Sequence, residues 1–212
     1  MKNLRKKISI EEIKRLYAIK KPDIQRRIKD FSNIKPKDYF YELIYCLLTP
    51  QSSAVNAEKV VNILKDKKFH IRQINLESIL RQKDCYIRFH KTKSKHILKM
   101  KKQFPEIMNE LKKSKSGEEL RLWLVNNVKG LGWKESSHFL RNIGYRNLAI
   151  LDRHILRNLK RLGVITKLLK TLNAKKYLQI EKKFKKFSKR IGISMDELDL
   201  LFWSMETGKI MK

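Results

Sequence analysis

Apolar residues recur along most of the chain at the three- and four-residue spacing of amphipathic α-helices. One such pattern runs from Ile10 to Phe31, and Pro22 is expected to divide it into two helical pieces. We find no convincing alternation of apolar and polar residues of the kind that predicts a half-buried strand. The hydrophobic pattern therefore predicts an all-α protein.

The segment from Asp38 to Leu48 is apolar on nearly every side, which is typical of a helix buried at the centre of a domain. A turn with the sequence Thr-Pro-Gln-Ser-Ser follows at residues 49–53, and its last residue, Ser53, can cap the next helix. Such a rigid turn can present a side chain outwards, and Gln51 is the residue so presented. An ordinary connection between two helices explains the same local sequence.

A strongly basic helix is predicted to begin at Thr92, with Ile97 and Leu98 facing inwards, and Pro105 suits the first turn of a further helix. Phe89 lies in the loop before this basic helix, between basic residues. A stacking aromatic ring is useful to a nucleic-acid-binding protein at such a place, but Phe89 could equally fill the core.

Two glycines, Gly130 and Gly132, separate two predicted helices further along the chain. The first of these helices opens with a serine–glutamate capping box, and the second begins at Lys134. Only glycine lets the backbone turn this sharply and then approach a phosphate closely. A lone Gly-x-Gly is a weak signal, but the flanking helices and the lysine after the turn favour a DNA-binding helix-hairpin-helix at about residues 118–143.

Lys134 and Asp152 are the candidate catalytic residues. A lysine is a nucleophile only when it is neutral, and a helix start in a strongly cationic protein disfavours the ammonium form. Asp152 opens a later helix, from which it could take part in proton transfer and stabilise a developing sugar cation. For an isolated aspartate at a helix start, capping alone is the commoner role.

The charge of the chain narrows the choice of partner. Lysine and arginine number 51 against 21 aspartates and glutamates, which gives a net charge of +30 spread along the whole sequence. A folded protein with this much like charge needs a polyanionic partner, nucleic acid first and an anionic membrane surface second. Because no apolar run is long enough to span a membrane and the N-terminus does not resemble a signal peptide, we expect a cytoplasmic protein.

Cys46 and Cys85 are the only cysteines. Two cysteines are too few for an iron–sulfur cluster, and their spacing does not suit zinc. We interpret both as buried, reduced thiols, and we expect no cofactor to be required.

Three stretches of sequence resemble a known family. Residues 128–159 resemble the helix-hairpin-helix and the loop before the catalytic aspartate of the DNA glycosylase superfamily that includes endonuclease III and the 8-oxoguanine glycosylases, and residues 47–53 resemble its early helix and turn. The sequences Gly-Leu-Gly-Trp-Lys-Glu-Ser-Ser-His-Phe-Leu-Arg-Asn, Leu-Asp-Arg-His-Ile-Leu-Arg and the ending Thr-Gly-Lys-Ile-Met-Lys are similar to the short archaeal-type 8-oxoguanine DNA glycosylase/lyases. The resemblance extends from about Tyr39 to Lys212.

Two departures from the superfamily pattern are visible. The four-cysteine cluster of endonuclease III is missing, which agrees with the smaller archaeal-type family. The proline of the superfamily's loop before the aspartate is also missing, and Gly144 and Asn147 are expected to shape that turn instead.

The resemblance implies a helix-hairpin-helix DNA glycosylase fold, in which residues 1–212 form a single catalytic unit. This unit would contain two helical subdomains, with the active site in the cleft between them. One subdomain is expected at residues 33–115, and the other at residues 1–32 together with 116–212.

The resemblance also implies roles for individual residues. Lys134 would attack C1′ of the sugar, displace the oxidised base and form a Schiff base that permits β-elimination, and Asp152 would be the catalytic aspartate. Phe89 and Trp203 would sandwich the extruded base. Lys212, with its terminal carboxylate, would accept the N7 hydrogen that distinguishes 8-oxoguanine from guanine. The remaining expected DNA contacts are Gln51, which would fill the gap left by the base, and Gly130, Gly132, Arg153 and His154.

Main-chain carbonyls of Asn126, Val128 and Leu131 would correspond to a monovalent cation site, for Na⁺ or K⁺, at the hairpin. The implied partner is double-stranded DNA that contains a damaged base, bound by a monomer. Two alternatives remain open: a glycosylase/lyase for another damaged base such as an oxidised pyrimidine, and a non-catalytic protein that binds DNA or RNA through charge. In the second alternative Lys134 would contact only a phosphate.

Overall fold

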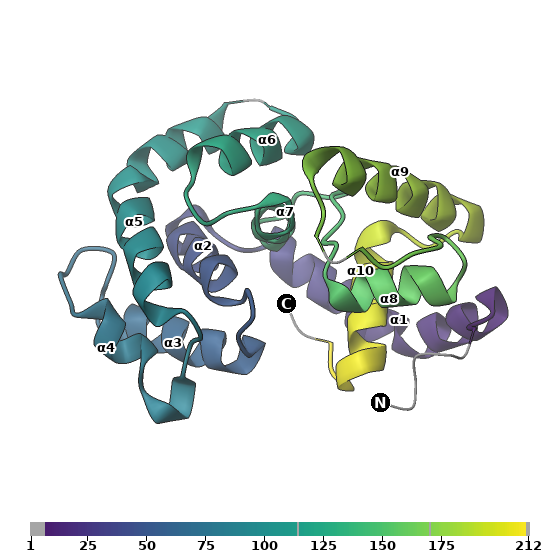
Figure 1. The fold of residues 1–212 in the computed structure, drawn as a ribbon, viewed down its shortest axis with the longest axis horizontal. Coiled ribbons are helices and arrows are strands. Elements are labelled where there is room, and N and C mark those ends of the chain that lie inside the picture. The colour runs from purple at the N-terminus through teal and green to yellow at the C-terminus, as the bar shows by residue number, and fades with distance from the viewer. Residues whose placement is uncertain (1–6, 114, 170, 211–212) are drawn as a thin grey trace. The chain divides into compact units, whose positions relative to one another are not determined.

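The structure is a computed structural model that describes residues 7–113, 115–169 and 171–210. Within these ranges the chain forms helices and no strand, so the predicted all-α class is confirmed (Figure 1). The chain divides into two compact units, one formed by Ile34–Phe139 and the other by Met1–Asn33 together with Leu140–Lys212.

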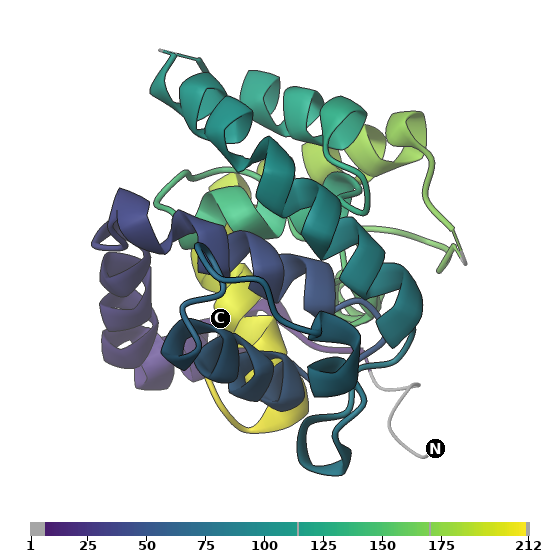
Figure 2. The same ribbon diagram turned by 90° about the vertical axis from the view of Figure 1, so that its left-hand side faces the viewer.

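The unit of residues 34–139 is built around one buried helix. Its elements are η1 (Pro36–Asp38), α2 (Tyr39–Leu48), α3 (Ala54–Asp66), α4 (Leu76–Leu80), η2 (Lys83–Cys85), α5 (His90–Lys112), α6 (Gly117–Asn127) and most of α7 (Trp133–Asn142). Every residue of α2 from Phe40 to Leu48 is buried, which confirms the predicted central helix. Helices α3 and α5 pack against α2 (Figure 2).

The other unit is organised around its last helix. Its elements are α1 (Ile10–Ser32), the end of α7, α8 (Arg153–Arg161), α9 (Ala174–Ile191) and α10 (Met195–Thr207). Helices α1, α8 and α9 each pack against α10. Ser194 and Glu197 form a capping box at the start of α10, and the Tyr17 hydroxyl of α1 donates to Glu197 Oε1 at 2.5 Å.

Two prolines lie inside continuous helices, which corrects the predicted breaks. Pro22 lies within α1 and Pro105 within α5. A proline removes one backbone hydrogen bond, but its φ is compatible with a helix, and packing on both sides can hold the helix together. Leu98 of α5 is 43% exposed, so its predicted inward orientation is wrong. The residues of α5 that face inwards on either side of Pro105 include Ile97, Met100 and Ile107.

The compact units divide the chain differently from the expected subdomains. Residues 116–139 were expected to join residues 1–32, but they belong to the unit of α2 and α5. The reason is local packing, because the hairpin backbone at Gly130 lies against His96 of α5 and Leu47 of α2. The rings of Tyr45 and His138, with centroids 5.7 Å apart, join α2 to α7 in the same unit.

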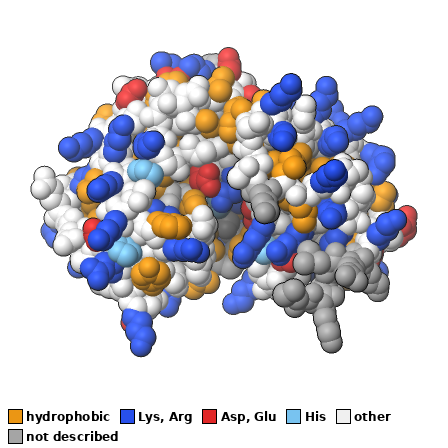
Figure 3. All heavy atoms as spheres, viewed as in Figure 1, with side chains coloured by type: hydrophobic (Ala, Val, Ile, Leu, Met, Phe, Trp, Pro, Cys, Tyr) orange, Lys and Arg blue, Asp and Glu red, His pale blue; other side chains and the backbone are white. Residues whose placement is uncertain are grey.

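Basic side chains are spread over the visible face of the molecule (Figure 3). Helix α9 shows how the sequence separates charge from core, since its lysines are exposed and most of its large apolar residues, Leu178 excepted, are buried. Cys46 and Cys85 are buried thiols that are not joined in a disulfide, as predicted. Among the described residues, no helix is both long enough and apolar enough to span a membrane.

Candidate functional site

The predicted helix-hairpin-helix is present, formed by α6, a tight turn and α7. Helix α6 begins with the predicted capping box, and its chain leaves the helix at Val128, whose φ of −102° and ψ of 105° are extended. The Leu131 N–H then donates to the Val128 carbonyl at 3.1 Å, which closes the turn. Gly132 N–H donates to Glu135 Oε2 at 3.1 Å, so a side chain of α7 satisfies the backbone at the point where that helix begins.

Gly130 is required in this turn by conformation and by space. Its φ of +97° is in the region that favours glycine. A Cβ atom at this position would lie 2.6 Å from His96 Nδ1 and 3.0 Å from Leu47 Cδ2. The turn can therefore lie this close to α5 and α2 only because Gly130 has no side chain.

The two hairpin helices are tied together beneath the turn. Arg121 of α6 is 1% exposed, and its Nη1 donates to Ser137 Oγ of α7 at 3.2 Å. Its guanidinium carbon lies 5.0 Å from the centroid of the Trp133 ring at the start of α7. Ser136 and Ser137 are fully buried, and their small side chains allow α7 to approach its neighbours closely.

Lys134 lies in the first turn of α7, directly after the hairpin. Its side chain is 28% exposed, and its Nζ lies 3.1 Å from Glu135 Oε1. Glu135 thus holds the hairpin N–H with one carboxylate oxygen and the lysine ammonium with the other. Sequence reasoning missed this role, although the Gly-x-x-Glu spacing from Gly132 to Glu135 is that of a helix cap.

Gln51 and Phe89 are exposed side chains on turns of the same unit as Lys134. Gln51 has a φ of 54° and Phe89 a φ of 59°, both in the left-handed region that residues other than glycine seldom adopt, at a cost of about 1–2 kcal/mol each. Phe89 is 49% exposed, so it does not fill the core, and the Arg88 guanidinium lies 4.9 Å from its ring centroid. Both side chains are therefore available to a ligand.

Asp152 lies in the other compact unit, at the N-cap of α8. Its Oδ1 accepts hydrogen bonds from the backbone N–H groups of His154 and Ile155, each at 2.8 Å. The capping role expected for such an aspartate is thus present. A catalytic role is compatible with it, because both capping bonds use the same carboxylate oxygen.

The loop that leads to Asp152 is held by buried polar side chains that sequence reasoning missed. Asp196 Oδ2 accepts from Asn147 N–H at 3.1 Å, and Glu181 Oε2 accepts from Ala149 N–H at 2.8 Å. The Tyr177 hydroxyl accepts from the Leu151 N–H at 3.2 Å and donates to the carbonyl of Ala149 at 2.6 Å. Tyr177 and Glu181 are four residues apart and share a helix face with Ile180 and Phe184, and a glutamate on such an apolar face is the sequence signal that could have found them.

The predicted turn residues of this loop are confirmed. Gly144 has a φ of +102° and Asn147 a φ of 65°, so both adopt the left-handed conformation that allows the chain to turn without the superfamily's proline. A Cβ atom on Gly144 would lie 3.4 Å from Ser32 Cα, which is ordinary contact. Glycine is therefore favoured at position 144 by its positive φ, and not by a lack of room for a side chain.

A buried carboxylate lies near Asp152 in the same unit. Burial raises the pKa of Asp199 to about 7, Arg141 opposes this shift, and the negative charges of Asp152 and Asp196 add to it. Arg141 Nη1 lies 3.3 Å from Asp199 Oδ2, and its guanidinium also stacks 4.4 Å from the ring centroid of Phe31. The start of α8 therefore lies near a set of interacting carboxylates, of which Asp196 and Asp199 are both buried.

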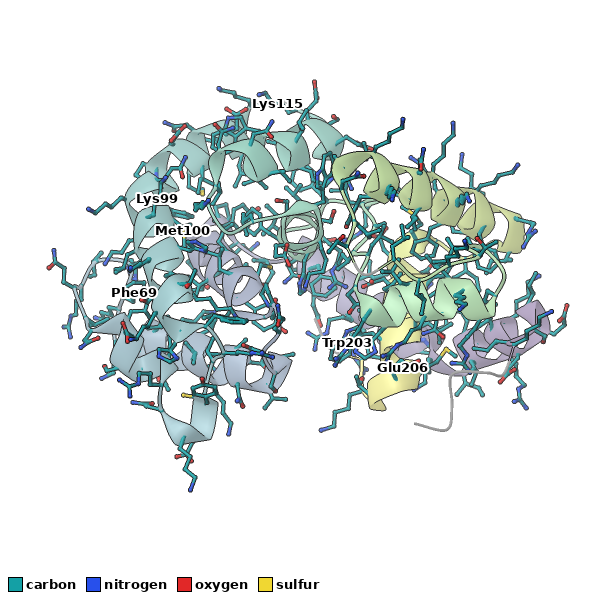
Figure 4. All side chains as sticks on the ribbon, viewed as in Figure 1. Phe69, Lys99, Met100, Lys115, Trp203 and Glu206 are labelled. Carbon is teal, nitrogen blue, oxygen red and sulfur yellow. The ribbon has the colours of Figure 1, made fainter. Side chains whose placement is uncertain are left out.

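Trp203, His154 and Arg153 gather where α8 packs against α10. The rings of His154 and Trp203 meet edge to face with centroids 6.0 Å apart, and Arg153 Nε donates to His154 Nε2 at 3.3 Å. Glu206 lies one turn after Trp203 on α10 (Figure 4), and its Oε2 is 3.7 Å from His154 Nδ1. Lys212, the expected recognition residue for 8-oxoguanine, lies outside the described residues.

The expected cation ligands at the hairpin are backbone carbonyls. Val128 is extended, which turns its carbonyl away from the helix axis of α6, and one of the two lone pairs of that oxygen is taken by Leu131 N–H. In the part of the chain that the structure describes, histidine, cysteine, aspartate and glutamate form no group of three or more able to hold a metal ion. A cation at the hairpin would therefore depend on main-chain oxygens.

The structure thus assembles two sets of predicted site residues, one in each compact unit. The unit of α2 carries Gln51, Phe89, Gly130, Gly132 and Lys134. The unit of α10 carries Asp152, Arg153, His154 and Trp203.

An all-α fold, a glycine hairpin and an accessible lysine at the start of the second hairpin helix define a helix-hairpin-helix protein. The chain belongs to the 8-oxoguanine DNA glycosylase family, because the helix-hairpin-helix model of that family matches residues 24–193. The expected family is therefore confirmed.

Relatives and solved structures agree with this assignment. The 8-oxoguanine DNA glycosylase/AP lyase of Fusobacterium nucleatum is 39% identical over 221 residues, covering 99% of this chain and 100% of the relative. The enzyme of the same name from Methanocaldococcus jannaschii is 35% identical over 206 residues, covering 96% and 97%.

The crystal structure of the Methanocaldococcus jannaschii glycosylase/lyase in complex with a 15mer DNA containing 8-oxoguanine is similar to this structure. Its TM-score is 0.87 at 33% identity, covering 96% of this chain and 99% of the other. The 8-oxoguanine DNA glycosylase of Thermotoga maritima has a TM-score of 0.86 at 32% identity, covering 96% and 98%.

Proposed function

We propose that this chain is a bifunctional DNA glycosylase/AP lyase that excises 8-oxoguanine from double-stranded DNA. The observation that carries the proposal is the position of Lys134, in the first turn of α7 directly after the glycine hairpin. The relatives with this family's fold are named 8-oxoguanine DNA glycosylase/AP lyase, and one of the similar structures is a complex with DNA that contains 8-oxoguanine.

The hairpin is proposed to grip the DNA backbone. Backbone N–H groups at the start of a helix attract phosphate, and Gly130 and Gly132 present backbone without side chains. Arg153 and His154, at the start of α8, are also proposed to contact a phosphate. The net charge of +30 supplies the long-range attraction for the polyanion.

Lys134 is the proposed nucleophile. Its neutral amine would form a bond from Nζ to C1′ of the sugar as the bond from C1′ to the base breaks, and the base would leave with that electron pair. The nitrogen then loses a proton, which the departing base takes up. The C1′–O4′ bond breaks as the nitrogen lone pair forms a double bond to C1′, and O4′ takes up a proton, which leaves an open sugar joined to Lys134 as a protonated Schiff base. Removal of a C2′ proton from this intermediate lets the 3′ phosphate leave by β-elimination, which cuts the strand.

Asp152 is assigned the carboxylate role in this reaction. A carboxylate stabilises the positive charge that develops on the sugar as the base departs, and it can carry a proton between steps. Both capping bonds of α8 end on Oδ1 of Asp152, so its Oδ2 is the oxygen proposed to act on the sugar.

The base must leave the helix stack before an amine can reach C1′, and this extrusion costs a few kcal/mol. Gln51 is proposed to fill the gap, and Phe89 and Trp203 to stack on the extruded base. The 49% exposure of Phe89 supports this assignment, because a ring that filled the core could not stack on a ligand. Lys212 remains the proposed source of the acceptor for the N7 hydrogen of 8-oxoguanine.

A monovalent cation at the hairpin would be held by the carbonyls of Asn126, Val128 and Leu131. The extended conformation of Val128 and the free lone pair on its oxygen fit such a role. Bound there, the cation would neutralise part of the charge of a DNA phosphate.

The proposal is tested by incubating the purified chain with end-labelled duplexes that contain 8-oxoguanine, an oxidised pyrimidine or only normal bases. We expect release of 8-oxoguanine and strand cleavage at its position, with no cleavage at guanine. Cleavage only at the oxidised pyrimidine, or binding of all three duplexes without cleavage, would contradict the proposal.

A further inference from the structure

Lys93 of α5 is a lysine buried beneath the turn that presents Gln51. Lys93 is only 6% exposed. Burial, together with the nearby positive charge of Lys134, lowers the pKa of the Lys93 ammonium to about 8. The ammonium lies 2.6 Å from the carbonyl of Leu48, 2.6 Å from the carbonyl of Pro50 and 3.0 Å from Ser52 Oγ. All three partners are neutral oxygens, so the bonds match the three donors of an ammonium without forming an ion pair.

The same hydrogen-bond network extends to the loop that presents Phe89. Ser52 Oγ, which accepts from Lys93, also accepts from the backbone N–H of Arg88 at 3.0 Å. The backbone N–H of Lys93 donates to the Phe89 carbonyl at 2.9 Å, because Phe89 is the N-cap of α5. A bond of 3.0 Å from Asn56 Nδ2 to the Tyr86 carbonyl joins the loop to α3 as well.

The two segments joined in this way share an unusual feature. Gln51 and Phe89 are exposed, neither is glycine, and both have a positive φ, 54° and 59° respectively. Backbone in this region persists where surrounding contacts hold it in place. The bonds of Lys93 and Ser52 are such contacts, and they act on both segments at once.

We propose that Lys93 is a positioning residue for base extrusion, which ties the turn of Gln51 to the loop of Phe89 and so holds both side chains in the conformation that meets the DNA. This inference rests on the proposed function, because it assigns a step of that reaction to a residue that does not touch the substrate. Because Gln51 and Phe89 are already ordered in the free protein, DNA binding does not have to supply the free energy of ordering them.

The test compares three variants with the unmodified chain. Ser52→Ala removes only the shared oxygen and leaves the charge of Lys93 in place, whereas Lys93→Met removes the ammonium. Lys101→Met is the matched control, since Lys101 also lies on α5 and also donates to two backbone carbonyls, those of Phe69 at 2.5 Å and Arg72 at 2.6 Å. Lys101 joins α5 to the segment that follows α3, and within the described part of the chain its ammonium donates to neither turn.

Two reactions are measured under single-turnover conditions. One is excision of 8-oxoguanine paired with cytosine, which requires extrusion, and the other is borohydride trapping on a preformed abasic site, which has no base to extrude. We expect Ser52→Ala and Lys93→Met to lower excision by about tenfold or more and trapping by about twofold or less, with Lys101→Met close to the unmodified chain in both. If Lys93→Met does not fold, Ser52→Ala decides the outcome.

Excision at the unmodified rate in both variants would overturn the proposal. Trapping that falls as far as excision would also overturn it, because Lys93 would then act through the charge of Lys134. Hydrogen exchange of the Arg88 amide tests the tie without activity: we expect faster exchange in Ser52→Ala, and unchanged exchange would refute the tie. An unmodified chain that excises nothing would contradict the proposed function, while this exchange measurement would still decide whether the tie exists.

Discussion

Gly130 turns the hairpin at a φ of +97°, with His96 and Leu47 packed where a Cβ atom would be. Gln51 and Phe89 adopt the same region of backbone conformation with full side chains, which extend outwards. The residue types differ because the hairpin packs its backbone directly against α5 and α2, whereas each of the two turns presents a side chain outwards.

Replacing Gly130 with alanine is expected to destabilise the chain by about 2–5 kcal/mol, from backbone strain together with the contact against His96. Gly163 provides the control, because its φ is +70° and nothing lies within 4 Å of a Cβ placed there. Gly163→Ala should cost only the strain, about 1–2 kcal/mol. Urea unfolding measures both values, and equal losses would show that packing against α5 does not matter.

Asp199 gives a prediction about pH. Burial raises its pKa from 3.8 to about 7, so the folded chain keeps a proton on Asp199 that the unfolded chain has already lost. The stability contributed by that proton is fully present below about pH 4 and is lost as the pH rises through about 7. Relative to Asp199→Asn, the unmodified chain should therefore lose unfolding free energy between these values. A constant difference across that range, measured by urea unfolding, would contradict the assignment.

At the scale of elements, capping residues in the sequence predicted the starts of helices correctly, whereas prolines predicted breaks in helices that the structure does not have. The capping box at Ser116 lies where the sequence predicts it, because such a cap depends on two residues only three apart. The box formed by Ser194 and Glu197 has the same spacing. Pro22 and Pro105 do not end helices, because tertiary packing on both sides outweighs one lost hydrogen bond.

The cap of α10 is worth testing because this helix carries Trp203 and Asp199 and packs against α1, α8 and α9. Ser194→Ala should lower the free energy of unfolding by about 1 kcal/mol. Ser194→Asp keeps a side-chain acceptor at the N-cap and should lose much less. If the two variants are equally destabilised, the capping bond from Glu197 N–H to Ser194 Oγ is not what stabilises the start of the helix.

At the scale of the whole molecule, the sequence predicted the helical class, the hairpin, the lysine after it and the capped aspartate. Residues that act across long sequence separations were missed. Lys93 is one more lysine in a basic helix until α5 is known to lie against α2, and Asp196 is one more polar position until the loop at Asn147 packs against it. The division of the chain was also missed, because it depends on the contacts of Gly130 with α5 and α2.

The net charge of +30 predicts that DNA binding depends steeply on salt. The logarithm of the binding constant for undamaged duplex should fall linearly with the logarithm of salt concentration, with a slope of about −0.9 for each phosphate contacted. We expect at least about five such contacts from a hairpin, a helix start and the surrounding basic surface. Fluorescence titrations at several salt concentrations give this slope, and a slope near zero would show that the excess charge serves another purpose.

The central claim, that Lys134 is the nucleophile, is tested most directly by mapping the covalent adduct. The chain is incubated with 8-oxoguanine duplex and borohydride, digested with protease, and the peptide that carries the sugar is identified by mass spectrometry. The account predicts a single modified residue, Lys134, and loss of the adduct in Lys134→Gln. An adduct on another lysine, or an undiminished yield in Lys134→Gln, would contradict it.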